Sequence, residues 1–140
     1  MSTNNPSEVT QAIVNSLKLM TNPSFKEVYY GEESMIPKTP AADIEFSMES
    51  EYAGAPFQLL HTFSGIINIH HGAFKDRRLS KRECNEAAEK VRDHLHLDYN
   101  LGGLLIHGFV SGMELGVTVM EETALWTTRL TYTGVSKTNG

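Results

Sequence analysis

The histidines are the residues most able to do chemistry in this 140-residue chain, because they bind metals and transfer protons near neutral pH. The natural pairs are His70 with His71 and His94 with His96. Neighbours on a strand face opposite sides, and residues two apart on a helix lie about 200° apart around its axis. Neither pair converges on one ion. Without a second cysteine or an H-E-x-x-H pattern, the sequence predicts no metal site and no cofactor.

A row of carboxylates is the second candidate for acid and base chemistry. Glu45, Glu49 and Glu51 share one face of an expected strand with Asp43. The simpler interpretation is that this row is the solvent side of a half-buried strand. Acidic rows can also face a basic neighbour across a subunit boundary, and the basic cluster at 75–82 would complement this row in a ring of identical subunits.

Other motifs give weaker signals for catalysis. The sequence LGGL at 101–104 follows an expected helix and precedes a strand, whereas phosphate-binding glycine loops open into a helix N-terminus. Ser64 lacks the G-x-S-x-G context of a hydrolase nucleophile, and Cys84 lies on the apolar face of an expected helix. We therefore expect no catalytic residue, and an enzyme is the less favoured class.

An aromatic row in the last expected strand has two interpretations. Trp126 and Tyr132 share strand parity with Thr128 and Leu130, and aromatic rows can stack nucleic-acid bases. The one interleaved basic residue, Arg129, lies on the opposite face. Packing in the core or at a subunit interface is therefore the favoured interpretation.

Two helices are expected to support these strands. The first runs from Pro6 to about Met20, because NPSE at 5–8 suits a capped helix start and apolar residues then recur at helical spacing. The second follows a capping box formed by Ser80 and Glu83 and continues to Leu95. Its apolar stripe comprises Cys84, Ala87, Ala88, Val91 and Leu95.

The extended segments complete the predicted fold. Strands are expected at 25–30, 42–49, 57–69, 104–110 and 125–135. We expect a bend at Gly65 and a long hairpin over 111–122. Because strands and helices do not alternate strictly, the order favours the α+β class, with an antiparallel or mixed β-sheet and two helices packed on one face.

Composition limits the organisation and the partners. A chain of 140 residues fits one domain, 1–140, whose ends at 1–5 and 136–140 are expected to be flexible. The net charge of -5 argues against a surface built mainly to neutralise phosphates. No apolar stretch approaches the roughly 18 residues that span a bilayer, and no signal peptide is recognisable, so we expect a soluble protein without a membrane partner.

Several segments together resemble a known family. They are VYYGE at 28–32, MIPKTP at 35–40, the capped helix at 80–95 leading to LGGL, and RLTY at 129–132. From residue 28 onward the chain resembles small tail-terminator or tail-completion proteins of tailed bacteriophages, which are minor tail or neck proteins. These motifs carry no catalytic signature.

The resemblance implies a virion structural protein in the tail or neck, assembled in the host cytoplasm. Such proteins form a homo-oligomeric ring, expected here to be a hexamer, that caps the tail tube protein and ends its polymerisation. The ring also joins the head-tail connector, and DNA passes through its lumen without specific binding. Alternatives are another neck component, such as a head-completion or stopper protein, a tail-tube subunit, or a small enzyme.

The sequence also offers candidate residues for contacts between subunits. They combine the acidic row, the basic cluster and the last strand. The candidate subunit-interface residues are Glu45, Glu49, Arg77, Arg78, Arg82, Trp126 and Arg129.

Charge reversal tests the acidic and basic surfaces directly. We expect Glu49→Arg to weaken assembly, because it places like charges at the proposed boundary, and Arg78→Glu in the same chain to restore it. Sedimentation velocity of the single and double variants measures the effect. Unchanged assembly in every variant would count against this pairing.

Overall fold

The fold is a mixed sheet covered on one face by two helices. The computed structural model describes residues 3–31, 38–54, 57–73, 79–120 and 123–139. Its elements are α1 (Pro6–Lys18), β1 (Glu27–Tyr30), β2 (Ala41–Tyr52), β3 (Gln58–Ala73), α2 (Leu79–Leu97), the short helix η1 (Leu101–Gly103), β4 (His107–Met120) and β5 (Thr123–Asn139).

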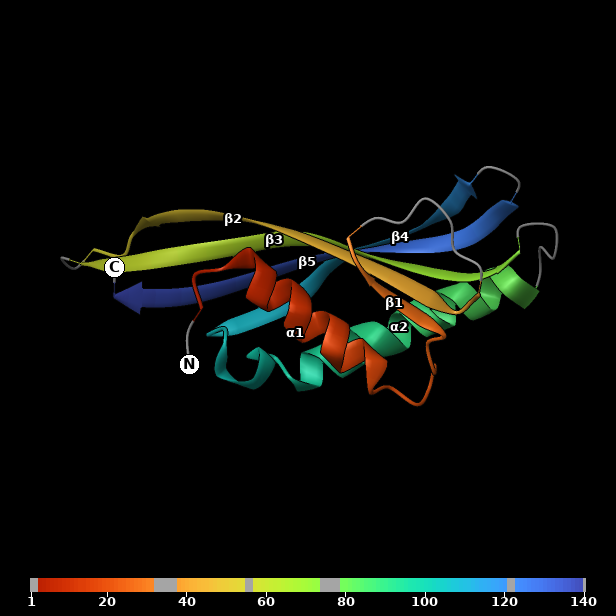
Figure 1. Cartoon of the computed structure of the whole chain (residues 1–140), viewed down its shortest axis with the longest axis horizontal. Helices are drawn as coiled ribbons and strands as arrows, with labels where there is room; N and C mark the ends of the chain where they lie inside the picture. The colour runs from red at the N-terminus through yellow and green to blue at the C-terminus, as the bar shows by residue number, and fades with distance from the viewer. Residues whose placement is uncertain (1–2, 32–37, 55–56, 74–78, 121–122, 140) are drawn as a thin grey trace.

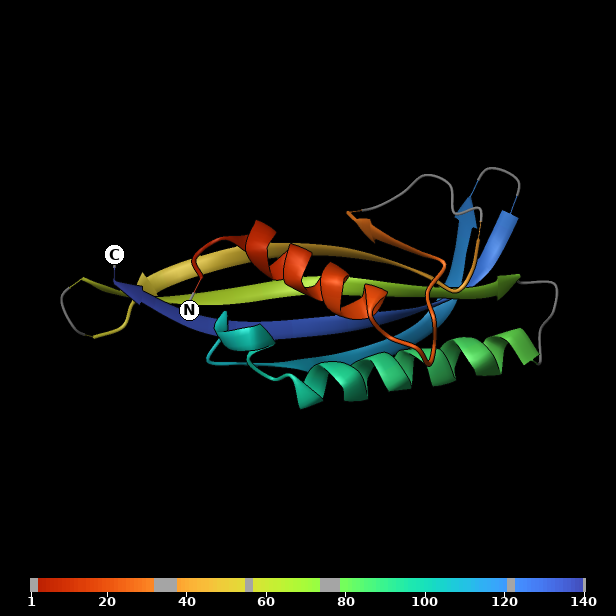
Figure 2. The same ribbon diagram turned by 60° about the horizontal axis from the view of Figure 1, so that its bottom comes forward.

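The strand order is β1-β2-β3-β5-β4. Only β1 and β2 are parallel, and the other neighbours are antiparallel. Both helices lie on the same side of the sheet (Figures 1 and 2), where their apolar residues join one core cluster with those of β2, β3 and β5. The predicted α+β class is confirmed.

Helix α1 buries the expected stripe but ends earlier than expected. Val9, Ile13 and Leu17 are fully buried. The helix ends at Lys18, and Leu19 at its C-cap is 81% exposed. The predicted cap is also different, because Asn5 makes no side-chain cap bond and its Nδ2 donates to Glu8 Oε1 at 2.7 Å.

Helix α2 buries its predicted stripe and begins earlier than its predicted cap. It starts at Leu79, so Ser80 lies inside the helix and not before it. Cys84, Ala88 and Val91 are fully buried. Burial raises the pKa of the Cys84 thiol, and hydrogen bonding to Thr128 acts in the opposite direction. A buried thiol with a raised pKa is a poor nucleophile, which agrees with a packing role.

The register of the three central strands aligns the apolar side chains under the helices. Ile67 of β3 pairs with Ile44 of β2 and Leu130 of β5. Two residues earlier in β3 and on the same face, Gly65 pairs with Phe46 of β2 and Tyr132 of β5. All three large residues of the first row are fully buried. The row is therefore a cross-section of the core.

Gly65 makes room for an aromatic ring in a part of β3 where the strand pairing is uninterrupted. The β2–β3 pairing is continuous through it, and the irregularity on the β5 side lies between His70 and Ala73. A Cβ at Gly65 would stand 2.3 Å from Phe46 Cδ1. The Phe46 ring therefore lies over Gly65, with its edge toward the Tyr132 ring at a centroid distance of 5.6 Å. No β-bulge lies at this position, and the expected bend stays a prediction.

The strands are longer than the helices that cover them. The 17 residues of β5 rise about 56 Å at about 3.3 Å per residue, whereas the 19 residues of α2 rise about 28 Å. Figure 2 shows the strands continuing past the start of α1, toward the end where both chain termini lie. We call this uncovered end of the sheet the arm, comprising residues 49–52, 58–61 and 134–139.

Hydrogen bonds hold both ends of the chain over their described residues. Thr3 N donates to Leu104 O at 3.1 Å, and the Ser136 hydroxyl donates to Thr3 O. Strand β5 continues to Asn139, which pairs with Gln58. Thr3 and Ser136, at the two ends predicted to be flexible, are therefore in contact with each other, and the flexibility of 1–5 and 136–140 stays a prediction.

The two last strands are longer than predicted, because the hairpin expected at 111–122 is itself built of strand. Its turn at 121–122 lies outside the described residues, as does most of the connection at 31–40. Among the described helices, none is long and apolar enough to cross a bilayer.

Gly65 provides a test of this packing. We expect Gly65→Ala to lower the free energy of unfolding by about 1–3 kcal/mol, because the new Cβ overlaps the Phe46 ring. The matched control is Gly116→Ala, where nothing lies within 4 Å of an added Cβ, and a change within about 0.5 kcal/mol is expected. Urea denaturation measures both, and equal effects would contradict the packing described.

Candidate functional site

Four features of the described surface and interior are candidates for function. They are a buried polar network on the open sheet face, a groove between the helices, the exposed aromatic residues at the end of the arm, and the margins of the sheet. Each is built by tertiary contacts between segments that are distant in the sequence.

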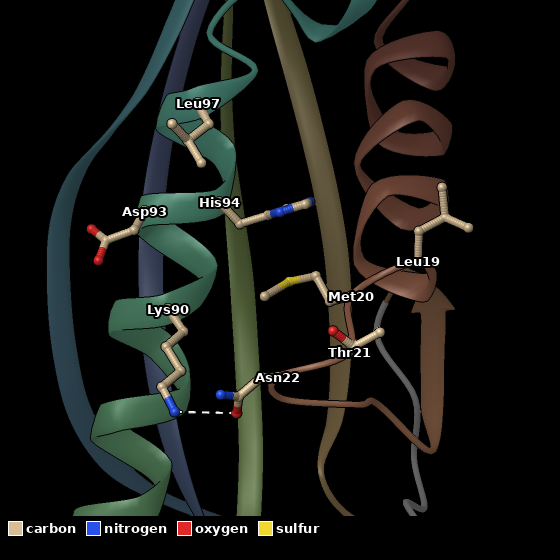
Figure 3. A pocket seen from close by; sticks show the side chains of 8 residues that line it. All are labelled: Leu19, Met20, Thr21, Asn22, Lys90, Asp93, His94 and Leu97. Carbon is tan, nitrogen blue, oxygen red and sulfur yellow. Dashed lines mark hydrogen bonds between the residues drawn. The ribbon is translucent and has the colours of Figure 1, made fainter.

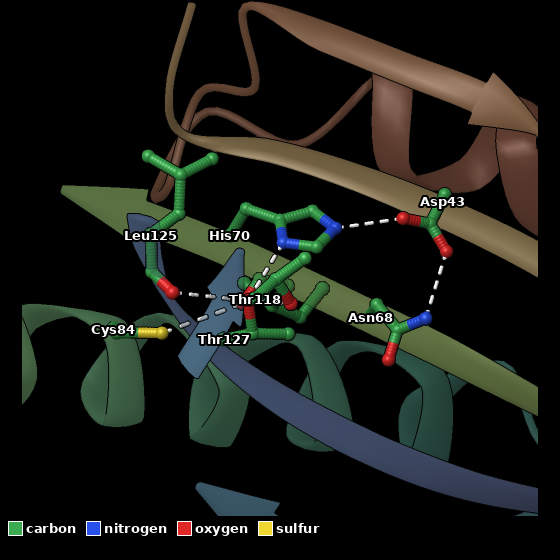
Figure 4. Close-up of polar contacts among 8 residues, drawn as sticks. Asp43, Asn68, His70, Cys84, Thr118, Leu125 and Thr127 are labelled. Atoms are coloured by element: carbon green, nitrogen blue, oxygen red, sulfur yellow. Dashed lines mark hydrogen bonds and ion pairs between the residues drawn. The ribbon is translucent and has the colours of Figure 1, made fainter. Parts of the chain in front are cut away.

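The polar network lies where β2, β3 and β5 meet on the face opposite the helices (Figure 4). His70 Nε2 donates to Asp43 Oδ2 at 2.7 Å, and His70 Nδ1 shares a hydrogen bond of 2.8 Å with Thr127 Oγ1. Asn68 Nδ2 donates to the other Asp43 oxygen at 2.8 Å. Thr127 Oγ1 also contacts Thr118 Oγ1 on β4 at 2.7 Å. The network therefore joins four adjacent strands.

Burial decides what this network can do. His70 is 2% exposed, Asp43 5% and Thr127 7%. Asp43, His70 and the Thr127 hydroxyl are linked in the same order as the groups of a hydrolytic triad. In such a triad the hydroxyl is the nucleophile and must be accessible to a substrate. The Thr127 hydroxyl is buried and already bonded to Thr118. The arrangement is suited to fixing strand register, since buried polar groups with satisfied hydrogen bonds specify one packing.

Asp43 was expected on the solvent side of β2, and this expectation is wrong. The same face is covered at this end of the sheet, where Ala41 and Leu125 are buried with Tyr29 packed against them. The alternation along β2 correctly places Asp43 opposite the helices. The alternation could not show that Ala41, Leu125 and Tyr29 form a second, smaller apolar cluster on that part of the face.

A groove lies between the end of α1 and the last turns of α2 (Figure 3). Its volume is about 430 Å³. The lining residues are Leu19, Met20, Thr21, Asn22, Lys90, Asp93, His94 and Leu97. Both leucines are more than four-fifths exposed, at 81% for Leu19 and 86% for Leu97. The groove is therefore an open depression lined by polar and apolar side chains, of which the two leucines are largely exposed.

Polar contacts fix the geometry of the groove across the two helices. His94 Nε2 and Ser16 Oγ share a hydrogen bond of 2.8 Å, and Lys90 Nζ donates to Asn22 Oδ1 at 3.1 Å. Asp93 is paired outside the groove with Arg92, whose Nε donates to Asp93 Oδ1 at 3.1 Å. Lys90 thus has no carboxylate partner among the described residues, which leaves a positive charge beside the apolar side chains.

The arm ends in a turn with two exposed aromatic residues. We call Tyr52, Ala53, Gly54 and Phe57 the tip. Tyr52 is 79% exposed and Phe57 is 78% exposed. Phe57 has a φ of 68°, a conformation that costs roughly 1–2 kcal/mol for a residue with a Cβ. A large apolar side chain is therefore held in solvent on a strained backbone.

A histidine locks the base of the arm. His61 Nδ1 shares a hydrogen bond of 2.7 Å with Ser50 Oγ on β2, and its Nε2 shares one of 2.6 Å with Thr138 Oγ1 on β5. His61 is only 2% exposed. Its ring therefore ties three strands together where no helix supports them.

The margins of the sheet are open over long distances. Strand β4 is a terminal strand, and β2 has a partner on its outer side only from Ala41 to Ile44. One amide of β4 is covered, because Val110 N donates to His96 Nε2 at 2.9 Å. Exposed apolar side chains on β4 are Phe109, Val117 and Val119.

The interface candidates predicted from the sequence differ in their exposure to solvent. Glu45, Glu49 and Arg129 are exposed on the open sheet face. Arg82 is exposed on α2, and its Nε donates to Glu86 Oε1 at 2.9 Å. Trp126 is 9% exposed and packs within its own chain, under the Lys81 ammonium at 5.6 Å. It therefore offers little surface to a neighbour.

Two candidates, Arg77 and Arg78, lie outside the described residues. The basic cluster at 75–82 can therefore be placed only at its end, where Lys81 and Arg82 belong to α2.

The residues that could support an enzyme do not meet. His61 bonds to Ser50 and Thr138, and His70 bonds to Asp43 and Thr127. Glu49 and His107 are separated by two strands in the sheet order. Over the described part of the chain, no group of three or more His, Cys, Asp or Glu side chains is arranged to hold a metal ion.

Comparison with known proteins gives no identification. No protein-family model matches the sequence, and no curated protein matches it significantly. Function must therefore be argued from the geometry.

Sequence reasoning missed the groove and the tip. The groove forms because two helix ends lie side by side, as the contact of Ser16 with His94, 78 residues further along the chain, shows. The signal for the tip was present, since Tyr52 and Phe57 flank a Gly-containing turn. Their exposure depends on the lack of any helix over the arm.

Removing the acceptor of the polar network tests its structural role. We expect Asp43→Ala to lower the free energy of unfolding by about 3 kcal/mol, because the His70 and Asn68 donors lose a buried charged acceptor. Glu45→Ala, two residues along the same face and exposed, is the control, with an expected change within about 0.5 kcal/mol. A loss below about 1 kcal/mol for Asp43→Ala would contradict the network's role.

Proposed function

We propose that this chain is a virion structural protein of the tail-terminator type. In this proposal, copies of the chain form a ring, a hexamer, that caps the tail tube, stops its polymerisation and joins the tube to the head connector. The resemblance of the sequence from residue 28 onward suggests this role. The open margins of the sheet are the observation that carries it.

Strand β4 lacks most of the features that protect an edge strand. Natural edges are usually shortened or interrupted by lysine, proline or a bulge. β4 has 14 residues, among which Glu114 is the only one of the Asp, Glu, Lys and Arg types, and it contains no proline. Its protective features among the described residues are the irregularity between Val110 and Gly112 and the hydrogen bond from Val110 N to His96 Nε2. An edge of this kind is suited to a permanent partner.

A ring of identical copies would cover both margins at once. The exposed outer part of β2 and strand β4 lie at opposite edges of the sheet. Contact between the β2 edge of one copy and the β4 edge of the next is therefore head-to-tail. Head-to-tail contacts generate rings when the rotation closes and filaments when it does not. The two unlike margins therefore support a cyclic assembly better than a two-fold dimer.

The charge on the open sheet face suits passage of DNA. Glu45 and Glu49 are exposed there and make no ion pair with a described residue. Like charges repel the phosphate backbone, so an acidic lumen would let DNA pass without sticking. We expect this face to line the channel of the ring.

Another neck protein or a tail-tube subunit would use the same surfaces. These alternatives differ from a terminator in how many rings stack. Negative-stain electron microscopy of the purified chain, alone and with tail tubes, separates them. We expect single or few rings and tubes capped at one end, whereas long polymers of this chain would favour a tube subunit.

A charge on the β4 edge tests the role of the margin. We expect Val117→Lys, at a side chain that is 40% exposed, to reduce ring formation at least about tenfold, since an edge lysine opposes strand pairing. Thr131→Lys adds the same charge to the exposed face of the interior strand β5 and is expected to leave assembly intact. Sedimentation velocity measures both. Equal assembly of Val117→Lys and the wild-type chain would contradict the proposal.

A further inference from the structure

We infer that the tip of the arm in one copy docks into the groove between α1 and α2 of a second copy. The inference rests on the proposed ring, since it names one of the contacts between neighbours. The occupant is the aromatic pair Tyr52 and Phe57, and the receiving surface is the groove lined by Leu19, Lys90 and Leu97.

The tip is built to present apolar surface. Its two aromatic side chains are 79% and 78% exposed, and the backbone at Phe57 has a φ of 68°. Glycine would occupy this conformation without strain, so phenylalanine costs stability in the isolated chain. Strain of this kind persists where the side chain serves a purpose outside the fold.

The groove fits such an occupant in size and character. It is an open depression of about 430 Å³, which leaves room for an aromatic side chain. Leu19 and Leu97 line it and are almost fully exposed. An aromatic side chain seated between them would remove apolar surface of both partners from water.

The charges of the two surfaces are complementary. Glu51 lies on the arm directly before Tyr52 of the tip, is exposed, and makes no ion pair with a described residue. Lys90 lies in the groove and Lys18 adjoins it, while the charge of Asp93 is offset by its pair with Arg92. An acidic, aromatic tip therefore matches a basic groove with exposed leucines.

The occupant must be a second copy, because the tip cannot reach the groove of its own chain. The end of β2, the start of β3 and the C-terminal ends of the two helices are all drawn in Figures 1 and 2, where the strand ends lie well apart from the helix ends along the long axis. The arm that separates them is stiffened by the contacts of His61 with Ser50 and Thr138. Each copy thus offers one tip and one groove, which is a head-to-tail contact.

The contact is one part of a larger interface. Two aromatic side chains bury about 150–250 Å² each, whereas a stable interface needs about 800 Å² per partner. The margins of the sheet would supply the remainder in the proposed ring. The tip would then act as an anchor that fixes the position of neighbouring copies.

Replacing Phe57 by glycine separates folding from docking. Phe57→Gly relieves the backbone strain, so we expect the thermal midpoint of the monomer to stay level or rise, while self-association of the full chain weakens at least about tenfold. Leu97→Ser should weaken it similarly from the groove side. Ile66→Ser, at an apolar residue that is 37% exposed on the interior strand β3, is the control and should assemble like the wild-type chain. Sedimentation equilibrium gives the association constants, and wild-type values for Phe57→Gly and Leu97→Ser would overturn the inference.

Charge reversal tests the orientation of the contact. We expect Glu51→Lys and Lys90→Glu each to weaken association by about threefold to tenfold, and the double variant to recover most of the loss. Both side chains are exposed, so neither change should affect folding. Additive losses in the double variant would overturn the pairing of these two surfaces.

A photo-crosslinking amino acid in place of Phe57 identifies the occupant directly. Crosslinks from the tip to peptides containing Leu19 or Leu97 of another copy support the inference. Crosslinks to β4, to another face, or to a tail tube protein added to the mixture overturn it. Rings that form with the tip elsewhere would leave the proposed function standing, whereas tip-to-groove chains that never close into rings would refute the ring and retain the docking contact. A chain that stays monomeric alone and with tail tubes would refute both.

Discussion

The architecture depends on a mismatch in length between its strands and its helices. A helix rises about 1.5 Å per residue and a strand about 3.3 Å, so helices of 13 and 19 residues cannot cover strands of 16 and 17 residues. The helices cover the middle of one face, where Ile44, Ile67 and Leu130 form the core. The rest of the sheet must be stabilised by other means.

Polar contacts between strands take over where the helices are absent. At the arm, His61 joins β2, β3 and β5 through Ser50 and Thr138. On the open face, His70 joins the same strands through Asp43 and Thr127. Both histidines are buried and both bond on two sides, so each fixes the register of three strands. Two histidines that could have suggested catalysis instead hold an extended sheet together.

The same mismatch creates the surfaces that a partner can use. Without a helix above it, the arm carries its aromatic tip into solvent, and the outer strands keep open edges. The helices end at different levels, which leaves the groove between Leu19 and Leu97. These surfaces differ from one another: the tip differs from the groove, and the β2 edge differs from the β4 edge. A head-to-tail assembly joins two different surfaces of identical copies. A ring of identical copies would cover these exposed surfaces.

The sequence by itself determined the elements and the core. Helical spacing identified the buried stripes of α1 and α2, and alternation identified the strands and which of their residues lie under the helices. These patterns are local, because the spacing of apolar residues within one helix or strand is enough to identify its buried face. Only the tertiary structure decided that Asp43 is buried, that Gly65 accommodates the Phe46 ring, and that Leu19 and Leu97 border one groove. Each of these depends on which distant segment lies opposite, and a pattern within one segment carries no information about its neighbour.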